Sequence, residues 1–365
     1  MLKRLLAWLG GSTILVCASG CSAPAPETGD DPGADVAALT AGDVTFQATL
    51  RGTGKVTIHA SVYRNDAVRT GANVLAVHGL SETGFTYRPL AETIFSDPIL
   101  KWKVKNVIGI DMPGHGDSGF PSDLPNGARF GELAIEDNVS VVIQSLDALR
   151  AQRLAPRVIV GHSMGGLEVQ ATQQALLAQR SSLAAHGVFG AVLLAPVPPH
   201  GQQWNRAPTG DFTPLIVNDP VLGSYLNLPP QIFILQAFGR LDGTVAPNAP
   251  TPEQVVAGRY VGPEPVATLL QLIEATVPLP DGSTITLQRP TVNAGAFAPR
   301  NGTLTSVVGF SQDPLVPAGD LDDLYAHLTQ DQRGLLFRQV TADDAVHAMY
   351  ISNPAGMIDA IRRVF

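Results

Sequence analysis

The sequence predicts an α/β protein with a mostly parallel sheet, helices on both faces and an antiparallel hairpin at its start. Short apolar runs rich in Val and Ile alternate with segments of helical periodicity, which is typical of parallel strands joined by helices. The first two strands flank the turn Arg51-Gly-Thr-Gly54 and predict the hairpin. The expected strands are residues 44–50, 56–63, 74–77, 106–110, 158–160, 189–195, 306–310 and 335–340, and the expected helices include 135–149, 164–179 and 354–364.

The first 20 residues have the composition of a secretory signal peptide. Lys3 and Arg4 precede an apolar stretch over residues 5–16, and small residues at 18–20 come directly before Cys21. The apolar stretch is short and interrupted by glycine, which argues against a permanent transmembrane helix. The sequence therefore predicts export of the chain.

The residues before Cys21 resemble the lipobox of bacterial lipoproteins, although Ala18 stands where that pattern more often has leucine. The resemblance implies cleavage before Cys21, lipidation of this cysteine, and a lipoprotein of the cell membrane or the outer membrane. The alternative is an ordinary signal peptide that releases a soluble secreted protein. Residues 21–42, rich in Ala, Pro, Gly and Asp, predict a lipid-anchored flexible tether, and residues 43–365 the folded domain.

Composition and spacing argue against several classes of partner. The formal net charge is −8 at pH 7 and no basic block occurs, which argues against nucleic acid. Any membrane contact is expected through the lipid anchor rather than a basic surface. The two cysteines, Cys17 and Cys21, lie in or beside the signal, so the exported domain is expected to have no disulfide. No His-Glu-x-x-His, Cys-x-x-Cys or phosphate-loop motif occurs, so neither a metal nor another cofactor is expected.

Gly161-His-Ser-Met-Gly165 joins the expected strand 158–160 to the expected helix 164–179. A Gly-x-Ser-x-Gly match fits a turn serine as well as a catalytic one, because the chain has 36 glycines. The strand before it and the helix after it favour a nucleophile elbow, in which a sharp turn projects Ser163 above the sheet. The N-terminus of the following helix then points at the serine, where negative charge develops during acyl transfer.

Ligands of parallel sheets bind beyond the carboxyl ends of the strands, so the residues that follow each strand are the candidates. Asp313 follows strand 306–310, and His347 lies in the loop after the last strand. His78-Gly-Leu-Ser81 and the loop Asp111-Met-Pro-Gly-His-Gly-Asp-Ser118 follow two earlier strands. These motifs and the chain order Ser163, Asp313, His347 resemble the α/β-hydrolase family over residues 44–365, apart from one insertion.

The resemblance and the chemistry of the side chains assign roles. Ser163 is the expected nucleophile, His347 its general base, and Asp313 the carboxylate that orients the imidazole. The alternatives are a surface-loop histidine at 347 and a turn aspartate before Pro314. The expected oxyanion donors are the main-chain N–H of Met164 and, by resemblance to the family, that of Leu80.

Residues 197–303 interrupt the alternation of strands and helices, in the slot where this family commonly carries a cap over the active site. The insertion is rich in proline and has apolar stretches at 231–238 and 266–273, the second with the pattern of a short helix. Its apolar residues suit either a lid that closes on a lipophilic or aromatic acyl group or the small core of the cap itself.

The sequence thus predicts a serine hydrolase, similar to carboxylesterases and lipases, that cleaves a small-molecule carboxylic ester through an acyl-enzyme on Ser163. Hydrolysis of an amide or peptide, a lactone or a carbon–carbon bond uses the same residues and stays open. A remote alternative is a non-catalytic binding module at the cell surface.

Overall fold

The computed structural model describes residues 39–205, 212–278, 283–330 and 337–365. The expected signal peptide, the lipidation site Cys21 and most of the expected tether lie outside the described residues. Among the helices that are described, none has the length and apolar character needed to cross a membrane.

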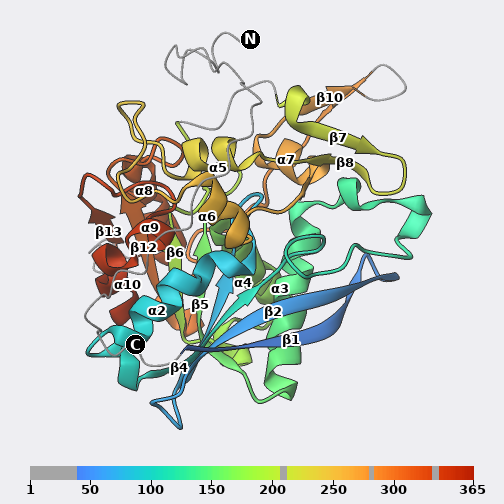
Figure 1. The fold of residues 1–365 in the computed structure, drawn as a ribbon. Coiled ribbons are helices and arrows are strands. Elements are labelled where there is room, and N and C mark those ends of the chain that lie inside the picture. Colours follow the sequence, from blue (N-terminus) through green and yellow to red (C-terminus); the bar gives the residue numbers. More distant parts are fainter. Residues whose placement is uncertain (1–38, 206–211, 279–282, 331–336) are drawn as a thin grey trace, which may run out of the picture.

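A sheet of eight strands forms the centre of the molecule, in the order β1-β2-β4-β3-β5-β6-β12-β13 (Figure 1). The β1–β2 hairpin is antiparallel and β2 pairs antiparallel with β4, whereas the other neighbours are parallel. This confirms the predicted fold class. The strands are β1 (Leu39–Leu50), β2 (Gly54–Asn65), β3 (Ala72–Val77), β4 (Val104–Ile110), β5 (Pro156–His162), β6 (Gly190–Leu194), β12 (Leu304–Phe310) and β13 (Phe337–Val340).

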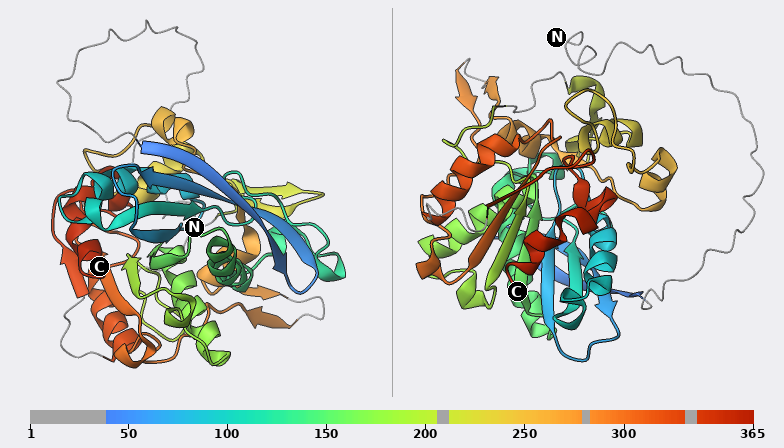
Figure 2. Two further views of the ribbon diagram at one scale, coloured as in Figure 1. Left: turned by 90° about the horizontal axis from the view of Figure 1, so that it is seen from below. Right: turned by 90° about the vertical axis from the view of Figure 1, so that its left-hand side faces the viewer.

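Helices cover both faces of this sheet (Figure 2). They are α2 (Arg88–Ser96), α3 (Ile135–Ala151), α4 (Met164–Ala178), α8 (Ala318–Thr329), α9 (Met349–Ser352) and α10 (Ile358–Arg362). The single helix expected over residues 354–364 is wrong in its first turn, which is a 3₁₀ helix over Pro354–Met357. Its cause is local: the side chain of Asn353 accepts a hydrogen bond from the N–H of Gly356 and caps a tighter turn before α10 starts.

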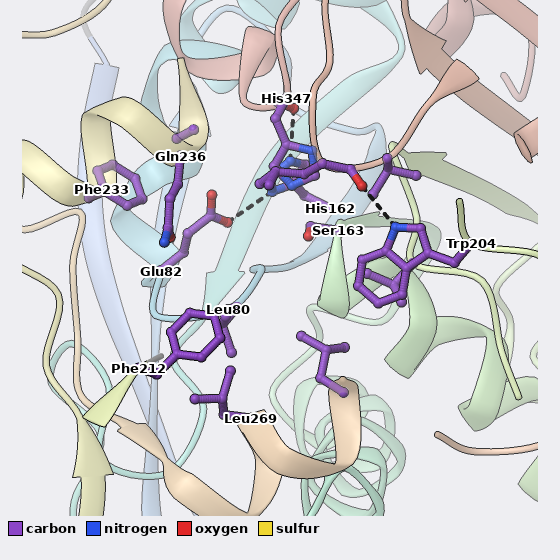
Figure 3. A pocket seen from close by; sticks show the side chains of 15 residues that line it. Leu80, Glu82, His162, Ser163, Trp204, Phe212, Phe233, Gln236, Leu269 and His347 are labelled. Atoms are coloured by element: carbon purple, nitrogen blue, oxygen red, sulfur yellow. Dashed lines mark hydrogen bonds and ion pairs between the residues drawn. The ribbon is translucent and has the colours of Figure 1, made fainter. Parts of the chain in front are cut away.

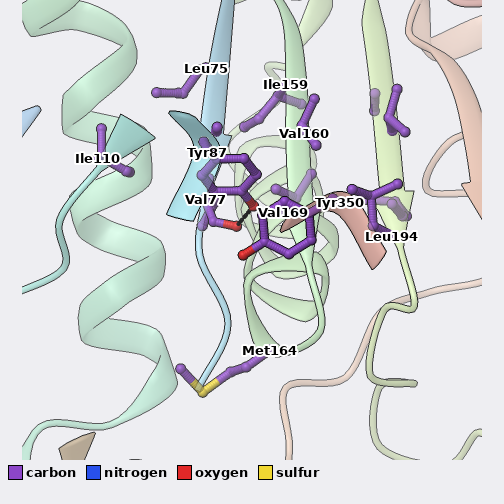
Figure 4. Close-up of a cluster of buried hydrophobic side chains, with 14 of the residues drawn as sticks. Leu75, Val77, Tyr87, Ile110, Ile159, Val160, Met164, Val169, Leu194 and Tyr350 are labelled. Atoms are coloured by element: carbon purple, nitrogen blue, oxygen red, sulfur yellow. Dashed lines mark hydrogen bonds between the residues drawn. The ribbon is translucent and has the colours of Figure 1, made fainter. Parts of the chain in front are cut away.

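The core beneath the site is built from β3, β5 and two tyrosines (Figure 4). The rings of Tyr87 and Tyr350 lie 4.9 Å apart, and the Tyr87 hydroxyl donates to the carbonyl oxygen of Val77 at 2.6 Å. Both tyrosines are fully buried, so the hydroxyl of Tyr87 gains a partner where an unmatched one would be costly. This packing holds Tyr350 of α9, three residues after His347, against the carboxyl end of β3.

The segment between β6 and β12 (residues 195–303) leaves the sheet and returns to the neighbouring strand. Figure 1 shows it at the end of the sheet toward which the parallel strands point. Leu226, Leu228 and Leu269 form a small core of their own within it. Its elements are β7 (Ile216–Asp219), β8 (Gly223–Leu226), α5 (Pro230–Ala237), α6 (Pro252–Ala257), β9 (Glu264–Pro265), α7 (Val266–Leu272), β10 (Thr276–Pro278) and β11 (Thr284–Thr286).

Candidate active site

Ser163 lies at the turn between β5 and α4 with a strained backbone. Its φ is 53° and its ψ is −118°, outside the regions that residues with a side chain ordinarily occupy. The flanking glycines make the turn possible. A Cβ at Gly165 would stand 2.3 Å from the carbonyl oxygen of Val77, and one at Gly161 would stand 2.6 Å from that of Gly165. The turn therefore brings the N-terminus of α4 directly against β3, as the Gly-x-Ser-x-Gly interpretation requires.

The main chain of Ser163 is held by hydrogen bonds, whereas its hydroxyl has none among the described residues. The N–H donates to Leu194 at 2.9 Å, and the carbonyl oxygen accepts from Val197 at 3.0 Å. No hydrogen bond from a described residue reaches Oγ. Ser163 is 8% exposed and lines a pocket that is also lined by His347 (Figure 3).

The structure brings Asp313 and His347 together. Nδ1 of His347 lies 2.8 Å from Oδ2 of Asp313, and both side chains are buried. Oδ1 of Asp313 accepts from the main-chain N–H groups of Leu315 and Val316, at 2.7 and 2.9 Å, which fixes the carboxylate. Burial alone would lower the pKa of His347, but the charge and hydrogen bond of Asp313 outweigh it and raise the pKa above its ordinary value.

The second ring nitrogen of His347, Nε2, has no hydrogen bond among the described residues. This ring therefore has one nitrogen oriented by a carboxylate and the other free at a pocket that Ser163 shares. A general base needs this arrangement, in which the carboxylate of Asp313 keeps the proton on Nδ1 and leaves Nε2 able to accept one.

The two expected oxyanion donors lie at the same end of the sheet. Leu80 lines the pocket, and its neighbours Gly79 and Ser81 donate their N–H groups to two buried carboxylates, Glu82 and Glu264, at 2.7 and 2.8 Å. Met164 is the first residue of α4, where a helix leaves its N–H without an internal partner. The Met164 side chain is fully buried in the core (Figure 4). The roles of both N–H groups stay predictions.

Two further residues at the site, Glu82 and His162, were not expected from the sequence. Glu82 is 2% exposed and lines the pocket beside Ser163. Its Oε2 accepts from the N–H of Gly79 at 2.7 Å and the hydroxyl of Tyr350 at 3.0 Å, and it lies 3.0 Å from Nδ1 of His162. Nε2 of His162 donates to the main-chain oxygen of His347 at 2.9 Å. The pair thus connects the loop after β3 to the loop that carries His347.

Glu82 is held as a carboxylate. Burial works against its charged form, but His162 and the Gly79 N–H outweigh burial and lower the pKa to about 2. Both ring nitrogens of His162 face acceptors, Oε2 of Glu82 and the main-chain oxygen of His347. His78, on the other side of Gly79, is neutral, because burial and the nearby His115 lower its pKa to about 4.

The insertion supplies much of the pocket wall. Phe212, Phe233 and Leu269 line it, together with Trp204, whose indole N–H donates to the oxygen of Leu315 at 2.8 Å. Leu269 also belongs to the small core of the insertion. The apolar residues of the insertion thus contribute both to the pocket wall and to a core within the segment, and closure of a lid on an acyl group stays a prediction.

The loop over residues 111–118 supports the site from outside the pocket. Oδ1 of Asp111 accepts the N–H of Gly84 at 2.7 Å, and Oδ2 lies 2.7 Å from Nδ1 of His59. Over the described ranges, no group of three or more His, Cys, Asp or Glu residues is placed to hold a metal ion.

Comparisons with solved structures found several proteins with the same fold as this chain. A peroxisomal α/β-hydrolase of Saccharomyces cerevisiae is 15% identical, with 89% of this chain and 88% of that chain covered and a TM-score of 0.52. The N-acyl homoserine lactonase AidH is 16% identical, with 88% and 95% covered and a TM-score of 0.51. A serine hydrolase from the polyaromatic-hydrocarbon-degrading bacterium Cycloclasticus zankles is 15% identical, with 88% and 98% covered and a TM-score of 0.50.

At these identities the likeness shows the fold. A comparison with curated proteins found no significant match. The family model described as "Alpha/beta hydrolase family" matches residues 74–360, which contain Ser163, Asp313 and His347. This chain belongs to the α/β-hydrolase family, whose members are hydrolases.

Proposed function

We propose that this protein is a serine hydrolase that cleaves a carboxylic ester through an acyl-enzyme on Ser163. The observation that carries the proposal is the 2.8 Å contact between His347 and Asp313 at a pocket that His347 shares with Ser163. A serine hydroxyl is a weak nucleophile until a base takes its proton, and an imidazole oriented by a carboxylate is suited to do so.

The proposed reaction has two halves. Oγ of Ser163 attacks the carbonyl carbon while Nε2 of His347 takes the hydroxyl proton, and the main-chain N–H groups of Leu80 and Met164 stabilise the oxyanion. The C–O bond to the alcohol breaks as His347 returns the proton to the leaving oxygen. Water then attacks the acyl-enzyme, giving its proton to His347, and the acid leaves as Ser163 regains a proton.

Apolar and aromatic walls support a lipophilic or aromatic small-molecule ester as substrate. Trp204, Phe212, Phe233 and Leu269 surround a cavity of about 80 Å³. Because the cavity is small, short acyl groups are the first probes. Amides, lactones and β-diketones belong in the same panel, because the same three side chains can serve their hydrolysis.

The substitution Ser163→Ala tests the proposal. We expect turnover of p-nitrophenyl butyrate to fall at least about 10⁴-fold, with unchanged circular dichroism, because the nucleophile is lost and the fold is kept. Ser181→Ala, three residues after the end of α4, is the matched control and should be fully active. A Ser163→Ala protein with undiminished turnover, or one still labelled by a fluorophosphonate probe, would remove Ser163 from the mechanism.

We also propose that the protein is exported and anchored by lipid on Cys21. The support is the sequence pattern around this cysteine. In bacteria that process lipoproteins, the full-length protein should appear in the membrane fraction and incorporate labelled palmitate, whereas Cys21→Ala should do neither. A Cys21→Ala protein that remains in the membrane fraction would contradict the anchor.

A further inference from the structure

The carboxylate of Glu82 has one oxygen fully used and the other unused. The three protein donors, from Gly79, His162 and Tyr350, all converge on Oε2. No hydrogen bond from a described residue reaches Oε1. Figure 3 shows one carboxylate oxygen joined to His162 and the other without a partner at the pocket. Glu82 is 2% exposed, and only one of its two carboxylate oxygens accepts hydrogen bonds from the protein. The other oxygen is expected to accept a hydrogen bond from a further group, because a buried acceptor without a donor is costly in free energy.

The Glu82 carboxylate lies on the same pocket as Ser163 and His347. A Cβ placed on Gly79 would stand 3.0 Å from Oε2 of Glu82, 3.1 Å from Nδ1 of His162 and 3.1 Å from Cβ of Ser163, so the glycine lets the Glu82–His162 pair approach Ser163 closely. Gln236 of α5 is the other polar side chain on this side of the pocket, across from Trp204 (Figure 3). No side-chain hydrogen bond of Gln236 is made within the described residues. Its amide and the Glu82 carboxylate form a polar wall of a pocket whose remaining lining, apart from Ser163, His162 and His347, is mostly apolar or aromatic.

We propose that Glu82 determines specificity: its Oε1 accepts a hydrogen bond from an N–H or O–H group of the substrate, and its charge rejects substrates with an anionic group near the ester. The proposal rests on ester hydrolysis at Ser163 and narrows its substrate class. A substrate with a secondary amide group fits these two side chains best, since Glu82 can accept a hydrogen bond from the amide N–H while Gln236 donates one to the amide oxygen. A hydroxyl group satisfies Glu82 alone.

Three ethyl esters of nearly equal size test this on the full-length protein. Ethyl N-acetylglycinate has an N–H where ethyl 4-oxopentanoate has a CH₂, and monoethyl succinate carries a carboxylate. We expect kcat/KM to fall at least about tenfold from the first ester to the second, the range for a hydrogen bond to a charged group, and to fall further for the third. Each ester is also measured as a competitor of p-nitrophenyl butyrate, so that slow turnover still yields an inhibition constant.

Glu82→Gln should bring the ratio between the first two esters close to one and reduce the rejection of monoethyl succinate. It is also expected to slow all substrates, because it disturbs Gly79 and His162, so the ratio is the decisive quantity. Glu264→Gln is the matched control. Glu264 is equally buried and holds Ser81 of the same loop, but it does not line the pocket, so its variant should keep the wild-type ratio.

Equal kcat/KM and equal inhibition constants for the first two esters in the wild type would overturn the proposal and indicate that Oε1 binds water instead. A Glu82→Gln protein that keeps the wild-type ratio would overturn it as well. If Glu82→Gln does not fold, the wild-type ratio decides alone. Failure of the proposed function itself is separate, because it would appear as loss of all p-nitrophenyl ester turnover or as an active Ser163→Ala protein.

Discussion

Two buried imidazole–carboxylate pairs lie beside Ser163, His347 with Asp313 and His162 with Glu82. Their ring-to-carboxylate distances are 2.8 and 3.0 Å, and the two imidazoles lie 4.7 Å apart between ring centres. They differ in the other ring nitrogen. Nε2 of His162 is bound to the main-chain oxygen of His347, whereas Nε2 of His347 has no partner among the described residues. The same chemical pair can thus hold a loop or move a proton, depending on whether the second nitrogen is occupied.

The largest effect that this comparison predicts is at His347. In His347→Gln the pocket keeps a polar side chain but loses its base, and we expect kcat to fall at least about 10⁴-fold. Steady-state turnover of p-nitrophenyl butyrate measures the loss. A decrease below tenfold would mean that the free nitrogen of His347 is not the proton acceptor.

The second prediction concerns pH. The base works when neutral, so kcat/KM should rise with pH, with a midpoint above the ordinary histidine value because Asp313 raises the pKa of His347. In Asp313→Asn the burial of the ring is no longer opposed, so the midpoint should move to lower pH while kcat falls about 10²- to 10⁴-fold. A pH–rate profile of both proteins decides. An unmoved midpoint would separate Asp313 from the titrating group.

The third prediction tests the holding role of the other pair. His162→Gln leaves the buried carboxylate of Glu82 without its imidazole partner, and the free energy of unfolding should fall by about 3 kcal/mol. The double variant Glu82→Gln/His162→Gln removes the unpaired charge and should recover part of this loss in urea denaturation. Equal stabilities of the single and double variants would show that the two side chains do not interact. The midpoint at which kcat/KM rises with pH should be the same in His162→Gln as in the wild type, because His347 keeps its contact with Asp313.

The smallest effect is expected at Leu80. The proposed contribution of this residue is its main-chain N–H, so Leu80→Ala should change kcat less than about tenfold while raising KM for apolar acyl groups. The contrast with His347→Gln separates main-chain from side-chain roles at the same pocket. A loss in kcat as large as that of His347→Gln would assign a catalytic part to the leucine side chain or its packing.

The part of the site that the sequence predicted follows from one rule of parallel sheets. Because these strands all end at one edge, residues in the loops after β5, β12 and β13 could be grouped without knowing the fold in detail. The strained turn at Ser163 has a local signature in its glycines, and Asp313 follows its strand directly. Each signal is carried by a few neighbouring residues.

Glu82 and His162 have no comparable local signal. Their partners lie far along the chain: Glu82 is 80 residues from His162 and 268 from Tyr350, and His162 is 185 from His347. The one available sign was that Glu82 follows β3 within five residues, in the same set of strand-end loops that contains Asp313. The 3₁₀ helix at the start of the last helical segment was missed although its cause is local. A single side-chain hydrogen bond, from the N–H of Gly356 to Asn353, caps this turn, and the apolar periodicity of the sequence does not reveal it.

The return of residues 195–303 to a strand that is hydrogen-bonded to the one they left has a consequence for evolution and engineering. The detour starts after Leu194, which pairs with Val308, and ends before Leu304, which pairs with Gly190, so it begins and ends in one ladder of the sheet. Its length and sequence can change without altering the register of any other strand. Most of the pocket wall around Ser163 can therefore be exchanged as a unit, and segments from other members of the family could be grafted between Leu194 and Leu304 to change the proposed substrate range while Ser163, Asp313 and His347 stay in place.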